Sequence, residues 1–135
     1  MKVQLDDGAF LPIRAYDSDA GLDLMSPVDF VIEPRKSVCI DTGVHCKIPE
    51  GWFGKLESKS GLNVKHNILC LGGVIDASYR GSIVVKLTNM GEKRYSAPRG
   101  SKICQMILIP CLLDSCEIGE LDETERGSNG FGSTG

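Results

Sequence analysis

The stretch GVIDASYRGSIVVKL, residues 73–87, combines a short apolar lead, a polar turn and a run of β-branched residues. Valine and isoleucine favour extended strands, so we predict a strand at Ile83–Leu87 and a hairpin before it. Asp76 interrupts the apolar lead of this hairpin. A carboxylate at such a position is commonly an Asx-turn residue, and the functional alternative is a general base held on a stiff hairpin.

A second clear strand is expected at Ile103–Ile109, which is also rich in β-branched residues. Only Ser58–His66 is expected to be helical, with Leu62 packing inward. Many short strands with frequent turns predict an all-β antiparallel sandwich, jelly roll or barrel. The shorter strand candidates are Val3–Leu5, Val28–Ile32, Val38–Ile40, Val44–Ile48, Trp52–Leu56 and Ile68–Leu71, with turn signals at Glu33-Pro34, Asn89–Glu92 and Ala97–Gly100.

The composition bounds the class of protein. The chain has 135 residues, which fits one domain, and its 41% hydrophobic and 24% charged residues are typical of a globular chain. The net charge of -3 leaves no basic excess for binding nucleic acid. Residues 1–10 lack the apolar core of a secretory signal, and no stretch reaches the length of a membrane span, so we expect a cytoplasmic protein.

The six cysteines indicate neither a metal site nor a disulfide framework. No two of them have CxxC spacing, and His45 and His66 lie beside no second ligand, which argues against zinc. Most of the cysteines lie in apolar runs such as Val38–Ile40. We therefore expect reduced, buried thiols that act as small apolar side chains.

Two polar residues lie within apolar strands. Strand alternation places Gln105 on the face of Ile103 and Ile107, and Asp23 lies between two leucines. Each position can simply face solvent at the edge or end of a strand. Alternatively, Gln105 donates its amide to a ligand, and Asp23 holds a metal ion or its water shell.

Two further segments have both a purely structural and a functional interpretation. SKSGL, residues 58–62, enters the short helix, so it is either an ordinary serine N-cap or a phosphate site that uses Lys59 and backbone N–H groups. Residues 125–135 taken alone resemble a frayed terminus. Their glycines nevertheless surround Arg126, which could clamp a phosphate, and Phe131, which could stack on a base.

Five motifs in this order closely resemble those of trimeric deoxyuridine triphosphatases (dUTPases). They are AGLDL (20–24), SKSGL (58–62), GVIDASYRG (73–81), RGSKICQMI (99–107) and RGSNGFGSTG (126–135), and together they span nearly the whole chain. The resemblance implies a jelly-roll homotrimer in which all three subunits build each site. It also implies Mg²⁺-dependent cleavage of dUTP to dUMP and pyrophosphate, which limits uracil in DNA and supplies dUMP for dTMP synthesis.

The resemblance also implies a β domain at residues 1–125 and a flexible glycine-rich lid at 126–135. Asp76 would orient and deprotonate the attacking water, and Asp23 would hold water bound to Mg²⁺. Tyr79 would pack under the sugar. The hairpin backbone at Gly73, Val74 and Ile75 would read uracil and the 3′-hydroxyl. The implied contacts to the phosphates are Lys59, Ser60, Gly61, Gln105, Arg126, Gly132, Ser133 and Thr134, with Phe131 stacked over uracil.

This chain departs from the common pattern of the resembled family at three positions. Lys59 stands where many members have arginine, which replaces a bidentate fork with a point charge. Leu22 replaces a frequent tyrosine, and we expect this to be a packing change. Cys70 stands where some members have a uracil-binding asparagine, which shifts uracil recognition toward the backbone.

Two other functions fit the same fold class. One is a binding module that docks on a regulator, and the other is a related dCTP deaminase. The retained catalytic residue types argue against loss of enzyme function, and the hairpin resembles a uracil reader. Both arguments favour the hydrolase.

Overall fold

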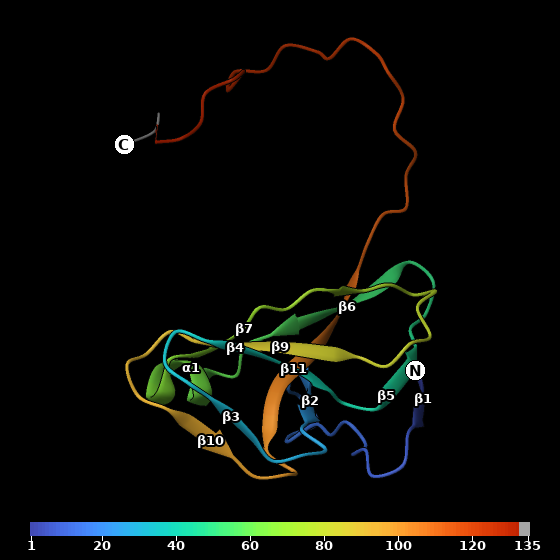
Figure 1. Ribbon diagram of the computed structural model, residues 1–135. Coiled ribbons are helices and arrows are strands. Elements are labelled where there is room, and N and C mark those ends of the chain that lie inside the picture. Colours follow the sequence, from blue (N-terminus) through green and yellow to red (C-terminus); the bar gives the residue numbers. More distant parts are fainter. Residues whose placement is uncertain (133–135) are drawn as a thin grey trace.

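In the computed structural model, which describes residues 1–132, the strand-forming segments pair into small antiparallel sheets around one core (Figure 1). The fold is therefore all-β with a single short helix in the described part, as predicted. The elements are β1 (Lys2–Leu5), β2 (Gly21–Met25), β3 (Phe30–Ile32), β4 (Ser37–Asp41), β5 (Val44–Lys47), β6 (Trp52–Glu57), α1 (Ser60–His66), β7 (Ile68–Cys70), β8 (Val74–Ile75), β9 (Val84–Asn89), β10 (Tyr95–Ala97) and β11 (Lys102–Pro110).

The largest sheet has the strand order β2-β11-β6-β8, and the long strand β11 is its centre. A three-stranded sheet, β4-β9-β7, packs against it, and the pairs β1-β5 and β10-β3 complete the body. Fully buried side chains such as Leu24, Val85, Ile103 and Met106 fill the space between the sheets. Their burial is the main stabilising contribution, at roughly 1.5–3 kcal/mol for each large apolar side chain.

Helix α1 spans seven residues and has a clear stop signal at its C-terminal end. It follows β6 and ends at Asn67, whose backbone is left-handed with φ 55° and donates to the carbonyls of Asn63 and Leu62. Such a residue commonly ends a helix. Leu62 packs against the core, which confirms the predicted inward face. Leu22 also packs against the core, in agreement with the expected packing change.

The cysteines agree only in part with the prediction of buried thiols. All six are free, and Cys46 and Cys104 are buried. The expectation is wrong for Cys39, which is exposed on β4, because alternate residues of this strand face solvent. Cys116 is also exposed, since it lies beyond the last strand.

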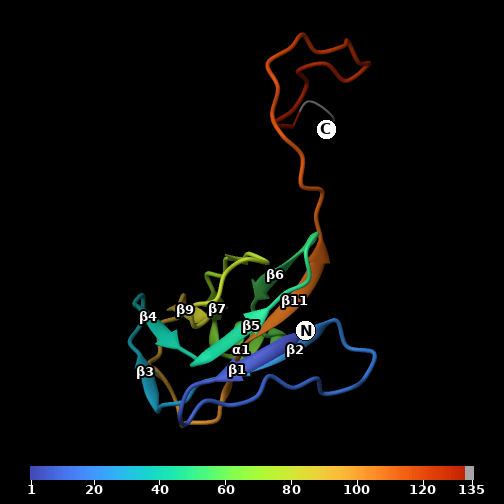
Figure 2. The same ribbon diagram turned by 90° about the vertical axis from the view of Figure 1, so that its right-hand side faces the viewer.

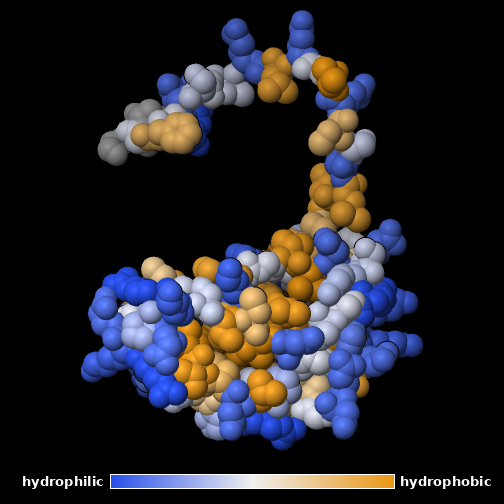
Figure 3. Space-filling model, in the orientation of Figure 1, coloured by the Kyte–Doolittle hydropathy of each residue, from blue (hydrophilic) through white to orange (hydrophobic). Residues whose placement is uncertain are grey.

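After Pro110 the chain leaves the body and runs outward without helix or strand through residue 132 (Figures 1 and 2). Leu112, Ile118 and Leu121 are almost fully exposed on this segment. Figure 3 shows apolar side chains along it from the point where it leaves the body. Within residues 1–132, no helix is long and apolar enough to cross a bilayer.

Candidate active site

The central sheet brings three of the predicted site residues together. Gln105 on β11 lies opposite Asp23 on β2 and opposite Glu57 on β6. Lys59 lies two residues after the end of β6, and its ammonium forms an ion pair with Asp23. The cross-strand register therefore gathers a carboxylate, an ammonium and an amide at one end of the sheet.

Asp23 is buried, with 6% of its surface exposed, and both of its carboxylate oxygens have cationic partners. Lys59 donates to Oδ1, and Nζ of Lys102 lies 2.8 Å from Oδ2. Burial opposes the charged form of Asp23, but the hydrogen bonds from Lys102 and Lys59 outweigh burial and hold the pKa of this carboxyl below its ordinary value. Asp23 is therefore an ionised anchor for two lysines.

Gln105 is fixed by the main chain of Ser58. Its Nε2 donates to the Ser58 carbonyl over 3.2 Å, and the Ser58 hydroxyl accepts from the backbone N–H of Cys70 at 2.9 Å. A Cβ at Gly21 would lie 2.3 Å from Oε1 of Gln105, so a larger residue at position 21 would force the Gln105 amide to shift. Gly21 of the first motif therefore packs closely against Gln105 of the fourth motif.

Ser60 and Gly61 begin helix α1 and are exposed beside this cluster. The N-cap position is Lys59, and no side chain within residues 1–132 caps the helix. This segment therefore does not form the serine N-cap that was the structural alternative to a phosphate site.

The third motif begins at the opposite edge of the same sheet. Its predicted pairing with the strand at Ile83–Leu87 is wrong for the described residues, because β8 pairs with β6 whereas β9 pairs with β4 and β7 in the other sheet. Residues 73–81, called the hairpin of the third motif, therefore bend from one sheet to the other. Val74 and Ile75 form β8 and pair with Lys55 and Gly54 of β6. The turn after them is closed by the N–H of Tyr79, which donates to the Asp76 carbonyl over 3.1 Å. Asp76 itself is exposed, and its carboxylate accepts no hydrogen bond from the described residues. The Asx-turn alternative is thus not realised.

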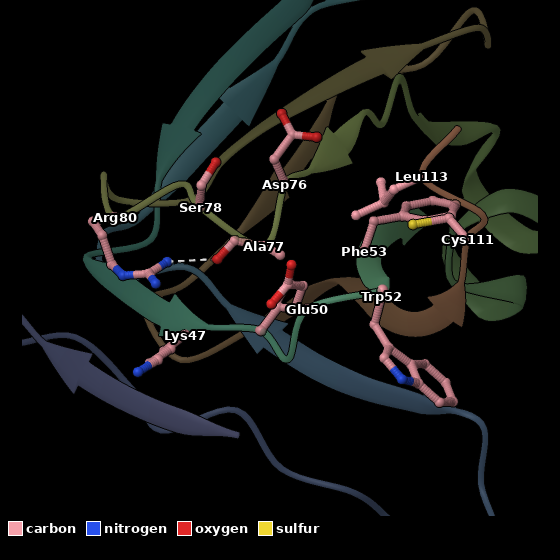
Figure 4. A pocket seen from close by; sticks show the side chains of 12 residues that line it. Lys47, Glu50, Trp52, Phe53, Asp76, Ala77, Ser78, Arg80, Cys111 and Leu113 are labelled. Carbon is pink, nitrogen blue, oxygen red and sulfur yellow. Dashed lines mark hydrogen bonds between the residues drawn. The ribbon is translucent and has the colours of Figure 1, made fainter. Parts of the chain in front are cut away.

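Arg80 and Tyr79 stiffen this hairpin from within. The Arg80 guanidinium donates to the carbonyls of Ala77 and Tyr79, each over 2.7 Å, and Figure 4 shows it turned back toward Ala77. The Tyr79 hydroxyl donates to the Ser82 carbonyl over 3.1 Å. A Cβ at Gly81 would lie 2.2 Å from that hydroxyl, so the glycine allows the ring to fold over the turn.

A hollow of about 490 Å³ lies beside the hairpin. Asp76, Ser78 and Arg80 line it together with Trp52 of β6 and Leu113 of the outgoing segment (Figure 4). Asp23, Lys59 and Gln105 do not line it. The carboxylate at position 76 and the cluster around position 23 therefore belong to different surfaces of one chain.

The sheet order explains this separation. Three steps between neighbouring strands lie between β2 and β8, and at roughly 4.8 Å for each step the two edges are about 14 Å apart. The third group is farther away still, because Arg126 and Phe131 lie on the segment that leaves the body. Among residues 1–132, the hydrogen-bond partner of the Arg126 side chain is the nearby Asn129 carbonyl, at 3.0 Å. Phe131 is fully exposed, and Gly132 follows it. The predicted contacts Ser133 and Thr134 lie outside the described residues.

Sequence reasoning did not single out Lys102 as a member of the Asp23 cluster, although the residue lies within the fourth motif. The usable signal was an opposite charge on a neighbouring strand. The pairing of β11 with β2 shifts between Lys102 and Cys104, and this irregularity changes where the Lys102 side chain points.

Fold and site together define an all-β protein in which an exposed carboxylate, Asp76, and the cluster of Asp23 with two lysines lie on different surfaces. Comparison with known proteins identifies the group. The family model described as dUTPase matches residues 7–135. The deoxyuridine 5'-triphosphate nucleotidohydrolase of Clostridium tetani is 42% identical over 134 residues, which cover 97% of this chain and 92% of that protein. The mouse (Mus musculus) enzyme of the same name is 40% identical over 137 residues, covering 98% and 83%.

Solved structures give the same result. A variant of the Staphylococcus bacteriophage 80alpha dUTPase with dUpNHpp matches with a TM-score of 0.93 at 29% identity, covering 99% of this chain and 97% of that one. A variant of the phage phi11 dUTPase, described with a structural Mg(II) ion, matches with a TM-score of 0.78 at 27% identity, covering 92% and 97%. The chain belongs to the dUTPase family. Its activity is therefore the hydrolysis of dUTP, and the deaminase alternative is set aside.

Proposed function

We propose that the chain converts dUTP to dUMP and pyrophosphate at sites shared by three subunits, with Asp76 as the general base. The observation that carries this proposal is the exposed carboxylate of Asp76, which has no hydrogen-bond or ion-pair partner among residues 1–132. The hairpin that holds it is braced by Arg80 and lies apart from the cluster around Asp23. A base must be close to one water molecule and free of competing donors.

Phosphoryl transfer depends mainly on positioning and charge stabilisation. Asp76 would take a proton from the water that attacks the α-phosphate. Lys59 is already held at the cluster by Asp23, so its ammonium can turn to a phosphate without leaving the site. Ser60 and Gly61 lie exposed beside it, and Gln105 offers its amide. These groups would stabilise the charge that develops on the departing pyrophosphate.

Members of the dUTPase family use Mg²⁺. Within residues 1–132, no cluster of three metal-ligating side chains forms, and both oxygens of Asp23 face lysines. This donor set fits a Mg²⁺ ion held chiefly by substrate phosphates, with Asp23 acting through water, because Mg²⁺ retains several waters and needs only one or two carboxylates. The bound ion would supply charge neutralisation on the phosphates.

The hairpin would read the nucleoside. Val74 is exposed beside Gly73, and Ile75 is anchored in the core, so the backbone between them is presented from a fixed base. Backbone groups matched to uracil reject cytosine because a mismatch leaves polar groups unpaired. Tyr79 would pack against the sugar.

Residues 126–135 would close the site as a lid. Arg126 would clamp the γ-phosphate and Phe131 would stack over uracil, while Gly132, Ser133 and Thr134 would wrap the phosphates. Such closure excludes bulk water from the reaction. The outward course of residues 111–132 supports a reach to another subunit, and a homotrimer lets three separated groups meet. We place the reaction in the cytoplasm, or in the host cytoplasm if the source is a phage or virus.

Pyrophosphate release from dUTP, dCTP, dTTP and UTP tests the proposal. We expect turnover of dUTP alone, and equal turnover of dCTP would contradict backbone reading of uracil. Asp76→Asn should bind dUTP yet lose at least a hundredfold in kcat, within the usual range of about 10²–10⁴ for a general base. Asp7→Asn, at another exposed aspartate, is the matched control and should keep full activity.

A further inference from the structure

His45 lies on β5 behind the catalytic hairpin, at a position to which neither the motifs nor the proposed mechanism gives a role. Its Nδ1 lies 2.8 Å from the carbonyl oxygen of Arg80, the residue that follows the turn. Its Nε2 lies 3.1 Å from Oδ1 of Asp6, just after β1. The imidazole ring therefore bridges the hairpin to the N-terminal strand pair.

Both partners of this ring can only accept hydrogen bonds. A carbonyl oxygen and an ionised carboxylate have no proton to give, whereas a neutral imidazole has one N–H and one lone pair. Both contacts are hydrogen bonds only when both ring nitrogens carry a proton. The geometry thus selects the imidazolium form of His45.

The surrounding charges agree with this protonation state. Asp6 lies just after β1 and Asp41 is the last residue of β4, and both attract a positive ring. Lys2, Lys47 and Arg80 line the same hollow as His45 and oppose it. The hydrogen bond to the Arg80 carbonyl and the one to Asp6 raise the pKa of His45 above its ordinary value.

We propose that His45 is a positioning residue of the catalytic hairpin, which as an imidazolium ties the Arg80 carbonyl to Asp6 and makes the hairpin geometry depend on pH. The Arg80 side chain closes the turn from inside, and His45 holds the same residue from outside. Asp76 is four residues away on the turn that this contact holds. Loss of the proton removes one of the two bonds and loosens the hairpin.

The direction of the effect follows from the raised pKa. The bridge is complete below about pH 6.5, the ordinary pKa of histidine, and is lost as the pH rises through the higher pKa of the folded protein. The inference rests on the proposal that the hairpin carries the catalytic carboxylate. Its test must therefore distinguish failure of the bridge from failure of that assignment.

The experiment compares kcat/KM for dUTP in the full chain and in His45→Gln between pH 6 and pH 9. Dividing one kcat/KM value by the other at each pH cancels the pH effects that both proteins share, including the titration of the substrate and of the metal-bound water. We expect the unaltered chain to be about three- to tenfold more active at pH 6, the effect of one hydrogen bond, and the ratio to fall to about one at pH 9. His66→Gln, at the other histidine, is the matched control and should give a ratio near one throughout.

Asp6→Asn removes the carboxylate partner and should move the fall of the activity ratio to lower pH. NMR titration of the His45 ring should show both nitrogens protonated above pH 6.5. A ratio that is constant with pH, or a neutral ring at pH 6.5, overturns the inference even when Asp76→Asn is inactive. An active Asp76→Asn overturns the base assignment instead, whatever the protonation state of His45.

Discussion

Lys102 places its Nζ 2.8 Å from Oδ2 of Asp23, while Lys59 holds the other oxygen of the same carboxylate. A single buried anion thus positions two cations on different elements, one on β11 and one before α1. Truncating one partner of such a buried group leaves the others uncompensated. The stability of this end of the sheet and the placement of Lys59, the proposed phosphate-binding lysine, are therefore linked.

Asp23→Asn should lower the free energy of unfolding by an amount that depends on pH. The pKa of Asp23 is lowered in the folded state, so its stabilising contribution is present above the unfolded value of about 3.9 and is lost as the pH falls through the folded value. We expect the free energy of unfolding at pH 7 to drop by about 1–2 kcal/mol. Urea denaturation at fixed chain concentration measures it. A deficit that is equally large at pH 7 and pH 3 would argue against the ion pairs as its source.

Lys59→Met and Lys59→Arg separate charge from shape at the second motif. The methionine keeps the length of the stem but loses the bonds to Asp23 and to phosphate, so kcat/KM should fall by about ten- to a hundredfold. Arginine restores a cation with a bidentate fork and should stay active. Steady-state kinetics with dUTP provides the measurement. Equal activity of the two variants would remove Lys59 from phosphate binding.

Gly72→Ala tests how closely the hairpin approaches β6. A Cβ at position 72 would lie 2.3 Å from the Leu56 carbonyl oxygen, which is backbone and has no flexible end to move aside. We expect a loss of about 1–3 kcal/mol in stability from this overpacking. Gly73→Ala is the neighbouring control, because nothing lies within 4 Å of its Cβ. If thermal unfolding shows the same loss for both variants, steric contact is not the cause.

Ending the chain at Glu125 should leave the fold and the assembly unchanged but impair catalysis. Arg126 and Phe131 make no contact with the β body, and the segment that carries them leaves it after Pro110. Loss of the groups that position substrate can lower the rate by about a hundredfold. Sedimentation and kcat/KM are measured on the same preparation. Full activity of the shortened chain would reduce the lid to an ordinary frayed end.

The sequence predicted the class of fold because two of its longest strands, β9 and β11, each contain several β-branched residues. The regions of β9 and β11 follow directly from the runs at Ile83–Leu87 and Ile103–Ile109. The two residues of β8 and the three of β10 carry too little local signal and depend on pairing with β6 and β3. Ala97, taken as the start of a turn, is the last residue of β10.

The candidate site was predicted through its motifs rather than through its contacts. Asp23, Lys59 and Gln105 were expected to act on one substrate, and the structure places them together. The roles of Lys102 and His45 depend on neighbours far away in the chain: an irregular pairing brings Lys102 to Asp23, and a hairpin carbonyl meets His45. No local spacing encodes either relationship.

Asp76 and Gln105 lie on different surfaces of one chain, and this arrangement has a genetic consequence. If Asp76 and Gln105 of each site come from different subunits, a chain carrying Asp76→Asn and a chain carrying Gln105→Ala each lack a different part of the site. Co-expression of the two inactive chains would then assemble some sites with both residues intact and restore part of the activity. Conversely, one defective allele would lower the activity of an otherwise normal partner allele.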